Sequence, residues 1–210
     1  MTRTSERRPP PLVDRLPMRL PTLFFLFVGN FHSRRQVTAA VQALAQLPPR
    51  FHLVCVGEQY PPKLALFAEA LQRDQMTARV HCLGHVSDAD LHELYLRTVA
   101  LISPSRYEGF GLPVLEAMNR GTPVIAWDIP IMHEVAGKAA VLVPCDDVAA
   151  LAAAMHQLAT QEPTRQVLGA AGRVQARTFS WPRSAACFVS LLEEIAQEHR
   201  ARTEHFRTED

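Results

Sequence analysis

The sequence predicts an α/β fold built on a doubly wound parallel sheet of the Rossmann-like type. Six short apolar runs alternate with stretches of helical periodicity along the chain. Each run is apolar throughout rather than at every second position, which is typical of strands that are covered on both faces. Regular alternation of strands and helices implies right-handed crossovers between parallel neighbours.

The expected elements follow one another from residue 23 to residue 200. Strands are predicted over residues 23–28, 51–56, 79–83, 99–103, 123–127 and 140–143. Helices are predicted near residues 34–46, 62–75, 88–97, 113–120, 130–136, 147–159, 164–177 and 182–200. Residues 1–21 hold five prolines and five arginines, so we expect a tail or linker there. Residues 22–200 then form one domain, and residues 201–210 form a polar C-terminal tail.

Charge and hydropathy restrict the function. The chain has 22 basic and 21 acidic residues, a balance that argues against nucleic acid as a partner. The longest apolar run is too short to span a bilayer, and the N-terminus lacks the apolar core of a signal peptide. We therefore expect a cytoplasmic protein whose association with membranes is at most peripheral.

The four cysteines are expected to be free thiols. Cys55, Cys82, Cys145 and Cys187 are widely spaced and form no C-x-x-C pair. Three of them, Cys55, Cys82 and Cys187, lie in apolar runs, which predicts burial in a reducing compartment.

In a doubly wound sheet the ligand lies at the carboxyl ends of the strands, which directs attention to the stretch "YEGFGLP" after the fourth strand. Gly109 and Gly111 permit backbone conformations that are closed to other residues, and Pro113 suits the start of a helix. The amides of Phe110 to Leu112 would then face a phosphate at a helix N-terminus. A glycine turn that serves only close packing explains the two glycines equally well.

Two glutamates bracket this turn. Glu108 precedes the first glycine, and Glu116 is expected in the first turn of the following helix, on the side that faces the turn. Because bound phosphate repels a carboxylate, each glutamate should instead accept hydrogen bonds from hydroxyl groups. A sugar on one side and a ribose on the other describe a nucleotide sugar laid across the turn.

The charge of a diphosphate requires a cation, and the loop after the first strand supplies Arg34 and Arg35. Taken alone, two adjacent arginines more often lie on a solvent-exposed helix face than in a binding site. Its position at the carboxyl end of a strand favours anion binding.

Other polar patterns have simpler explanations. Asp88 and Asp90 form a D-x-D pattern suited to a divalent metal, but Ser87 with Asp90 is also a capping box, which we favour. A metal site at His81, Cys82 and His85 is disfavoured, because alternate residues of a strand point to opposite faces. His133 and Glu134 follow another strand and are weaker candidates for sugar contact. We expect no metal.

From about Leu23 to residue 200 the sequence resembles a known family. Four segments are characteristic: "LFVGNFHSRRQVTAAVQALAQLP", "LVCVGE", "RVHCLGHVSDADLHELYLRTVALISPSRYEGFGLPVLEAMNRGTPVIAWDIPIMHEVAGKAAVLVPCDD" and "RTFSW". Together they resemble the C-terminal, donor-binding half of family 4 of the retaining glycosyltransferases with the two-domain GT-B fold. The two glutamates, separated by seven intervening residues that include G-F-G-L-P, are the specific signature.

The resemblance implies roles for individual residues. Glu108 would hold hydroxyls of the donor sugar, and Glu116 would hold the ribose. The amides of Phe110, Gly111 and Leu112, with Gly109 in the same turn, would hold the distal phosphate, and the loop from Gly84 to Val86 would contact the base. Family members commonly place an arginine and a lysine against the diphosphate; these positions hold Asn30 and Arg35 here, with Arg34 beside them. Glu108 and Arg35 are the residues expected to act in catalysis.

The function implied is transfer of a sugar from a nucleoside diphosphate sugar with retention of configuration, by a mannosyltransferase-like hexosyltransferase that needs no cofactor. The family's acceptor-binding domain has no counterpart before Leu23, so we expect either a fragment of a longer protein or a subunit completed by a separate acceptor-binding partner. The alternative is a non-catalytic nucleotide-sugar-binding or scaffold subunit. A nicotinamide-dependent oxidoreductase is disfavoured, because only Gly29 stands where G-x-G-x-x-G is needed.

Overall fold

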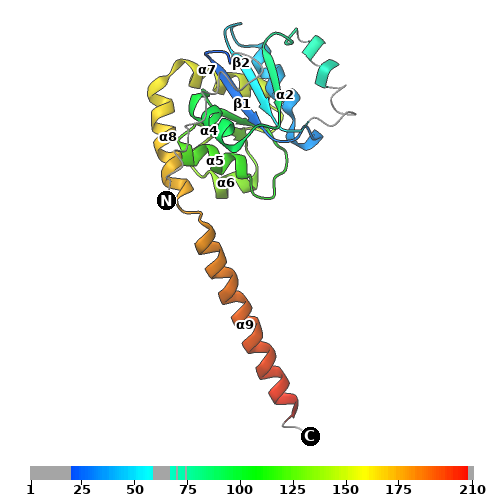
Figure 1. Ribbon diagram of the computed structural model, residues 1–210, viewed down its shortest axis with the longest axis vertical. Helices are drawn as coiled ribbons and strands as arrows, with labels where there is room; N and C mark the ends of the chain where they lie inside the picture. The colour runs from blue at the N-terminus through cyan, green and yellow to red at the C-terminus, as the bar shows by residue number, and fades with distance from the viewer. Residues whose placement is uncertain (1–19, 59–66, 70, 74, 208–210) are drawn as a thin grey trace, which may run out of the picture. The chain divides into compact units, whose positions relative to one another are not determined.

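A computed structural model describes residues 20–58, 67–69, 71–73 and 75–207. It confirms the predicted fold class, with a six-stranded parallel sheet in the order β3-β2-β1-β4-β5-β6. Figure 1 labels β1 and β2 together with the helices around the sheet. The strands are β1 Phe24–Val28, β2 His52–Val56, β3 Val80–Gly84, β4 Leu101–Ser103, β5 Val124–Trp127 and β6 Val141–Val143.

The strand order reverses between β1 and β4, which are neighbours in the sheet. Crossovers from β1 toward β2 and from β4 toward β5 run in opposite directions, so right-handed connections place their helices on opposite faces. Accordingly, α2 Val37–Ala45 contacts α7 Val148–Thr160, whereas α5 Leu112–Arg120 contacts α4 Asp88–Arg97 and α8 Glu162–Ala176. Ligands of such sheets bind where the order reverses, at the carboxyl ends of the strands.

The central strands explain the unbroken apolar runs. Every residue of β1 from Phe24 to Phe27 is at most 2% exposed, and β2 is buried from Leu53 onward. β1 pairs with β2 in register from Phe24 opposite His52 to Val28 opposite Val56. β3 lies at the sheet edge and is mostly half-buried or exposed after Val80. Burial of one large apolar side chain stabilises the fold by roughly 1.5–3 kcal/mol.

Some helix boundaries differ from the predictions. The helix expected over residues 34–46 is interrupted at Gln36, whose left-handed backbone (φ 43°) separates the 3-10 helix η1 Ser33–Arg35 from α2. Within the helix expected at 62–75, residues 67–69 and 71–73 are helical, and the rest lies mostly outside the described residues. The remaining helices are α6 Pro130–Val135 and α9 Trp181–Arg207, which continues into the residues assigned to a polar tail.

The chain divides into two compact units, Met1–Ala176 (unit 1) and Arg177–Asp210 (unit 2), whereas the sequence predicts one domain through residue 200. All buried hydrophobic residues of the described chain lie in unit 1, and the last of them is Ala176. In α9, by contrast, large apolar side chains are exposed, among them Trp181, Phe188, Leu191, Leu192 and Ile195. No helix in the described part of the chain is long and apolar enough to cross a membrane.

The expected burial of the cysteines is correct only for Cys55, which lies in a central strand. Cys82 is exposed because β3 is an edge strand, and Cys187 is exposed on α9. Cys145 is also exposed, in the loop after β6, and all four thiols are free.

Candidate active site

The loops after β1 and β4 meet at the point where the strand order reverses. Nη1 of Arg35, in η1, lies 3.3 Å from Oε1 of Glu108, in the loop after β4. Both side chains are largely buried, at 18% and 6% exposure. The main-chain amide of Arg106 also donates to the carbonyl of Arg34 over 2.8 Å. The structure thus joins the arginine and the glutamate that the sequence predicted separately, and spacing along the chain contained no signal for this ion pair.

Gly29 makes room for this arrangement. Its φ of 146° is rarely adopted by residues with side chains, and a Cβ atom there would lie 2.4 Å from Arg35 Nη1. Arg35 Nη1 also lies 3.4 Å from the carbonyl oxygen of Val28. A glycine at the end of β1 therefore lets the Arg35 guanidinium fold back across the strand end and face Glu108.

The N-terminus of α5 presents main-chain donors beside this pair. Gly111 is the N-cap, with φ 90°, and no side chain caps the helix. Within the described part of the chain, the amides of Gly111 and Leu112 donate no hydrogen bond. Gly109, contrary to expectation, is not in the left-handed region, so only Gly111 needs the conformational freedom of glycine. A helix N-terminus with two uncommitted amides suits an anion.

Glu116 is held by a tyrosine that the sequence did not single out. α5 begins at Leu112, so Glu116 lies in the second turn rather than the predicted first. The hydroxyl of Tyr95 lies 3.0 Å from Glu116 Oε2 and 3.3 Å from the Pro113 carbonyl oxygen. Burial, and then the charge of Glu116, raise the pKa of Tyr95, so the hydroxyl keeps its proton and donates it. In the sequence Tyr95 appears only as an apolar helix position.

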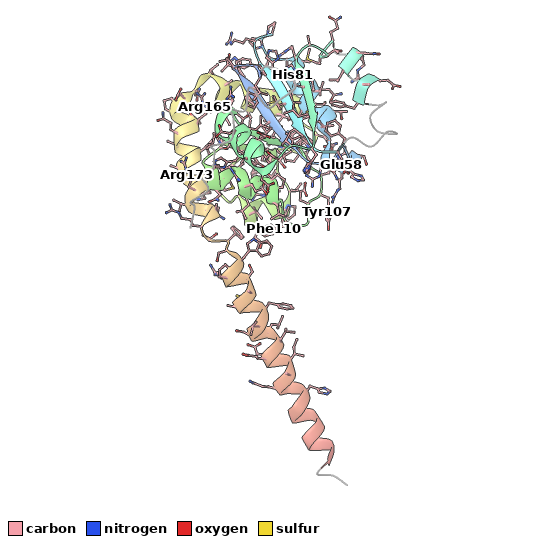
Figure 2. The ribbon with its side chains drawn as sticks, viewed as in Figure 1. Glu58, His81, Tyr107, Phe110, Arg165 and Arg173 are labelled. Atoms are coloured by element: carbon pink, nitrogen blue, oxygen red, sulfur yellow. The ribbon has the colours of Figure 1, made fainter. Side chains whose placement is uncertain are left out.

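The other predicted donor residues lie on strand ends that adjoin one another. The Gly57 amide, after β2, donates to the Gly84 carbonyl over 2.8 Å. A Cβ at Gly57 would meet the Gly29 carbonyl oxygen at 2.3 Å, so the ends of β1, β2 and β3 are in close contact. Asn30 accepts a hydrogen bond from the Glu58 amide through its side-chain oxygen. Figure 2 labels Glu58 among these loops, with Tyr107 and Phe110 of the loop after β4.

Arg34 and Val86 lie at the same end of the sheet. The Arg34 side chain is exposed, in η1 after β1. Val86 is half-buried and follows Gly84 in the loop between β3 and α4.

A second network, also not predicted, fixes η1. The indole N–H of Trp127 donates to Gln36 Oε1 over 2.7 Å, and Gln36 Nε2 donates to Asp146 Oδ1 over 2.8 Å. Arg106 completes the network with two bonds to Asp146, of 3.0 and 2.8 Å. The bond from Gln36, and then Arg106, lower the pKa of Asp146. Because Gln36 directly follows Arg35, the network ties the loops after β1, β4 and β6 and the end of β5 together beside that arginine.

The structure places the remaining candidates as follows. Ser87 caps α4, as predicted: its Oγ accepts from the Asp90 amide and donates to Asp90 Oδ2. His133 pairs with Asp128 at the surface, and Glu134 is exposed. Across the described residues, no three potential His, Cys, Asp or Glu ligands gather as a metal site would require.

Comparison with known proteins gives consistent matches. Residues 14–175 match the family described as glycosyl transferases group 1. An O-antigen chain mannosyltransferase B from Escherichia coli is 33% identical over 162 residues, which cover 75% of this chain and 42% of the relative. A D-inositol 3-phosphate glycosyltransferase from Salinispora tropica is 34% identical over 200 residues, 87% of this chain and 40% of the relative.

Among solved structures, a sucrose-phosphate synthase from Thermosynechococcus elongatus superposes with a TM-score of 0.78 and 27% identity. The match covers 89% of this chain and 49% of that protein. The chain thus spans less than half the length of the relatives it matches. The matches confirm the resemblance to the donor-binding half of GT-B glycosyltransferases.

Proposed function

Because the chain belongs to the glycosyl transferases group 1 family, we propose that unit 1 binds a nucleoside diphosphate sugar and serves its transfer with retention of configuration. The observation that carries this proposal is the ion pair of Arg35 and Glu108, which lies where the strand order reverses. Uncommitted amides of Gly111 and Leu112 lie in the same loop as Glu108.

Arg35 is suited to hold the diphosphate without leaving Glu108. A guanidinium has five N–H donors, and the polar contacts of the Arg35 guanidinium with Val28 and Glu108 involve Nη1. Its Nε and Nη2 groups remain for phosphate oxygens. The exposed Arg34 adds a second positive charge, and the amides at the start of α5 add the helix dipole. Together these groups would stabilise the negative charge that develops on the departing diphosphate.

The two glutamates each retain one oxygen for a hydroxyl group. Arg35 engages Glu108 at Oε1, which leaves Oε2 for a hydroxyl of the donor sugar. Tyr95 engages Glu116 at Oε2, which leaves Oε1 for the ribose. The O-antigen relative is a mannosyltransferase by name, so mannosyl donors are the first to test. In this proposal the acceptor is bound by a domain outside this chain.

Isothermal titration calorimetry with UDP-, GDP- and ADP-sugars tests the donor site. We expect saturable binding of at least one donor and a loss of about tenfold or more in affinity for Arg35→Gln, which removes a charged partner of the diphosphate. Arg50→Gln is the matched control, because Arg50 is an exposed arginine just before the start of β2, at the opposite end of the sheet. No binding of any donor up to millimolar concentration would refute the proposal.

Retention is tested separately once an acceptor-binding domain is supplied. The anomeric configuration of the first product, followed by NMR, should match that of the donor. An inverted product would contradict the mechanism while leaving the donor site intact.

A further inference from the structure

A polar cavity lies at the opposite end of the sheet from the proposed donor site. Its volume is about 340 Å³, and it is lined by the segments that lead into β4 and β5, by the last residues of α4 and α5, and by α8. In a parallel sheet these segments are at the amino ends of the strands, whereas Arg35 and Glu108 follow carboxyl ends. The cavity is therefore distinct from the proposed donor site.

Three arginines line this cavity: Arg120 of α5, and Arg165 and Arg173 of α8, of which Figure 2 labels the last two. Only Arg165 has a carboxylate partner among the described residues, at 3.0 Å from the exposed Glu162. The arginine-rich cavity therefore carries an excess of positive charge.

The partners of the other two arginines are uncharged. Arg120 donates to Nδ1 of His92 and to the Glu116 carbonyl, each over 2.9 Å, and its guanidinium lies 5.0 Å from the centre of the Tyr95 ring. Arg173 donates to the Arg120 carbonyl over 3.0 Å. A histidine ring carries no negative charge, so His92 does not compensate the charge of Arg120.

Helix capping explains part of this arrangement. Arg120 is the last residue of α5, and Arg173 reaches from α8 to the Arg120 carbonyl, so both guanidinium groups lie at the C-terminus of α5, where the helix dipole favours cations. The dipole amounts to about half a negative charge at that end, whereas two full positive charges converge there. Each guanidinium has five N–H groups, and the contacts above use a minority of them.

We propose that this cavity binds a small phosphate monoester. Arg120 and Arg173 would hold the phosphate oxygens, with Arg165 at the same cavity wall, because guanidinium groups match the geometry of phosphate. The cavity exceeds the size of a bare phosphate ion and falls in the range of small-molecule sites. Leu96, Val99 and Pro123 line it as well, and they would contact the non-phosphate part of the ligand. This second site does not depend on the donor site.

NMR titration of the full chain with inorganic phosphate and with phenyl phosphate tests the proposal. The amides of Gly121 and Gly169 report on the cavity, and those of Gly109 and Gly111 report on the donor site. We expect both probes to shift the Gly121 and Gly169 signals, with phenyl phosphate binding more tightly. Shifts confined to Gly109 and Gly111 would overturn the proposal.

Two variants at the cavity and one control variant at the donor site show where phenyl phosphate binds. Arg173→Gln removes a phosphate donor. Gln166→Glu adds a carboxylate at the cavity, and it changes an exposed residue whose side chain makes a long bond of 3.4 Å from Nε2 to Glu162 Oε1. Each variant should lower the affinity of the cavity for phenyl phosphate by about tenfold. Arg35→Gln should leave that affinity unchanged. If Gln166→Glu folds normally and binds like the wild type, the site is not the arginine-rich cavity.

Discussion

Glu108 and Glu116 differ in what holds them, and the family resemblance implies different roles for them. Glu108 pairs with a cation, Arg35, whereas Glu116 accepts a hydrogen bond from a neutral hydroxyl, that of Tyr95. A carboxylate that faces the ribose contributes to the affinity for every nucleotide ligand. A carboxylate that faces the transferred sugar contributes to affinity only when the ligand carries that sugar.

We predict that Glu116→Ala weakens the binding of free nucleoside diphosphate and of nucleotide sugar equally, by about 1.5–3 kcal/mol, as expected for the loss of hydrogen bonds to a charged group. Glu108→Ala should leave the affinity for free nucleoside diphosphate unchanged, because Arg35 keeps its charge. It should abolish the extra affinity that the sugar provides. Calorimetry with both ligands measures the two effects. If each variant only lowers the melting temperature and leaves the preference between the ligands unchanged, both glutamates are structural.

Tyr95 is a positioning residue for Glu116 in this scheme. Tyr95→Phe keeps the buried ring and removes the hydroxyl that contacts Glu116 Oε2 and the Pro113 carbonyl oxygen. We expect the affinity for nucleoside diphosphate to fall by about threefold to tenfold. Affinity for inorganic pyrophosphate, which lacks a ribose, should stay unchanged. An equal loss for both ligands would indicate that Tyr95 supports the fold of the site as a whole rather than Glu116.

At the scale of elements, the edge of the sheet contains a pair of histidines. The His52 ring in β2 stacks on the His81 ring in β3, with Nδ1 of the first 3.0 Å from Nε2 of the second. One of these nitrogens must donate and the other accept, so the bond requires at least one neutral ring. Burial is the main cause that lowers the pKa of both histidines, with the charge of Arg79 adding to the effect on His52.

A lowered histidine pKa destabilises the folded state in acid. Below the ordinary value of 6.5 the unfolded chain binds more protons than the folded chain, so the free energy of unfolding decreases as the pH falls through that value. We predict a decrease between about pH 8 and about pH 5.5, measured by urea denaturation. His81→Gln should make the decrease smaller, and His156→Gln, on the exposed surface of α7, should not. Equal pH dependence in both variants would exclude this pair as the cause.

At the scale of the whole molecule, unit 1 contains a complete core. The buried hydrophobic cluster of the described chain includes residues of the sheet and of α2, α4, α5, α6, α7 and α8, but none from α9. We therefore predict that a chain ending at Ala176 folds cooperatively, with a melting temperature within a few degrees of the full chain. Calorimetry and urea denaturation provide the comparison. Loss of cooperative unfolding would mean that unit 2 contributes to the stability of unit 1.

The sequence by itself determined the architecture and the general position of the site. Apolar runs such as residues 23–28 and 51–56 predict strands that are buried on both faces, and parallel connectivity requires their loops to gather at one end of the sheet. The cap of α4 at Ser87 and the glycine at the start of α5 were also predictable, because both depend on contacts within a few residues.

Only the tertiary structure decided which side chains meet. The partners Arg35 and Glu108, Tyr95 and Glu116, and Trp127 and Gln36 lie between 21 and 91 residues apart, so no local pattern links them. The exposure of Cys82 likewise depends on its strand being at the sheet edge. Local propensity and periodicity act over a few residues, whereas a site formed by several loops depends on strand order, which brings distant segments of the chain together.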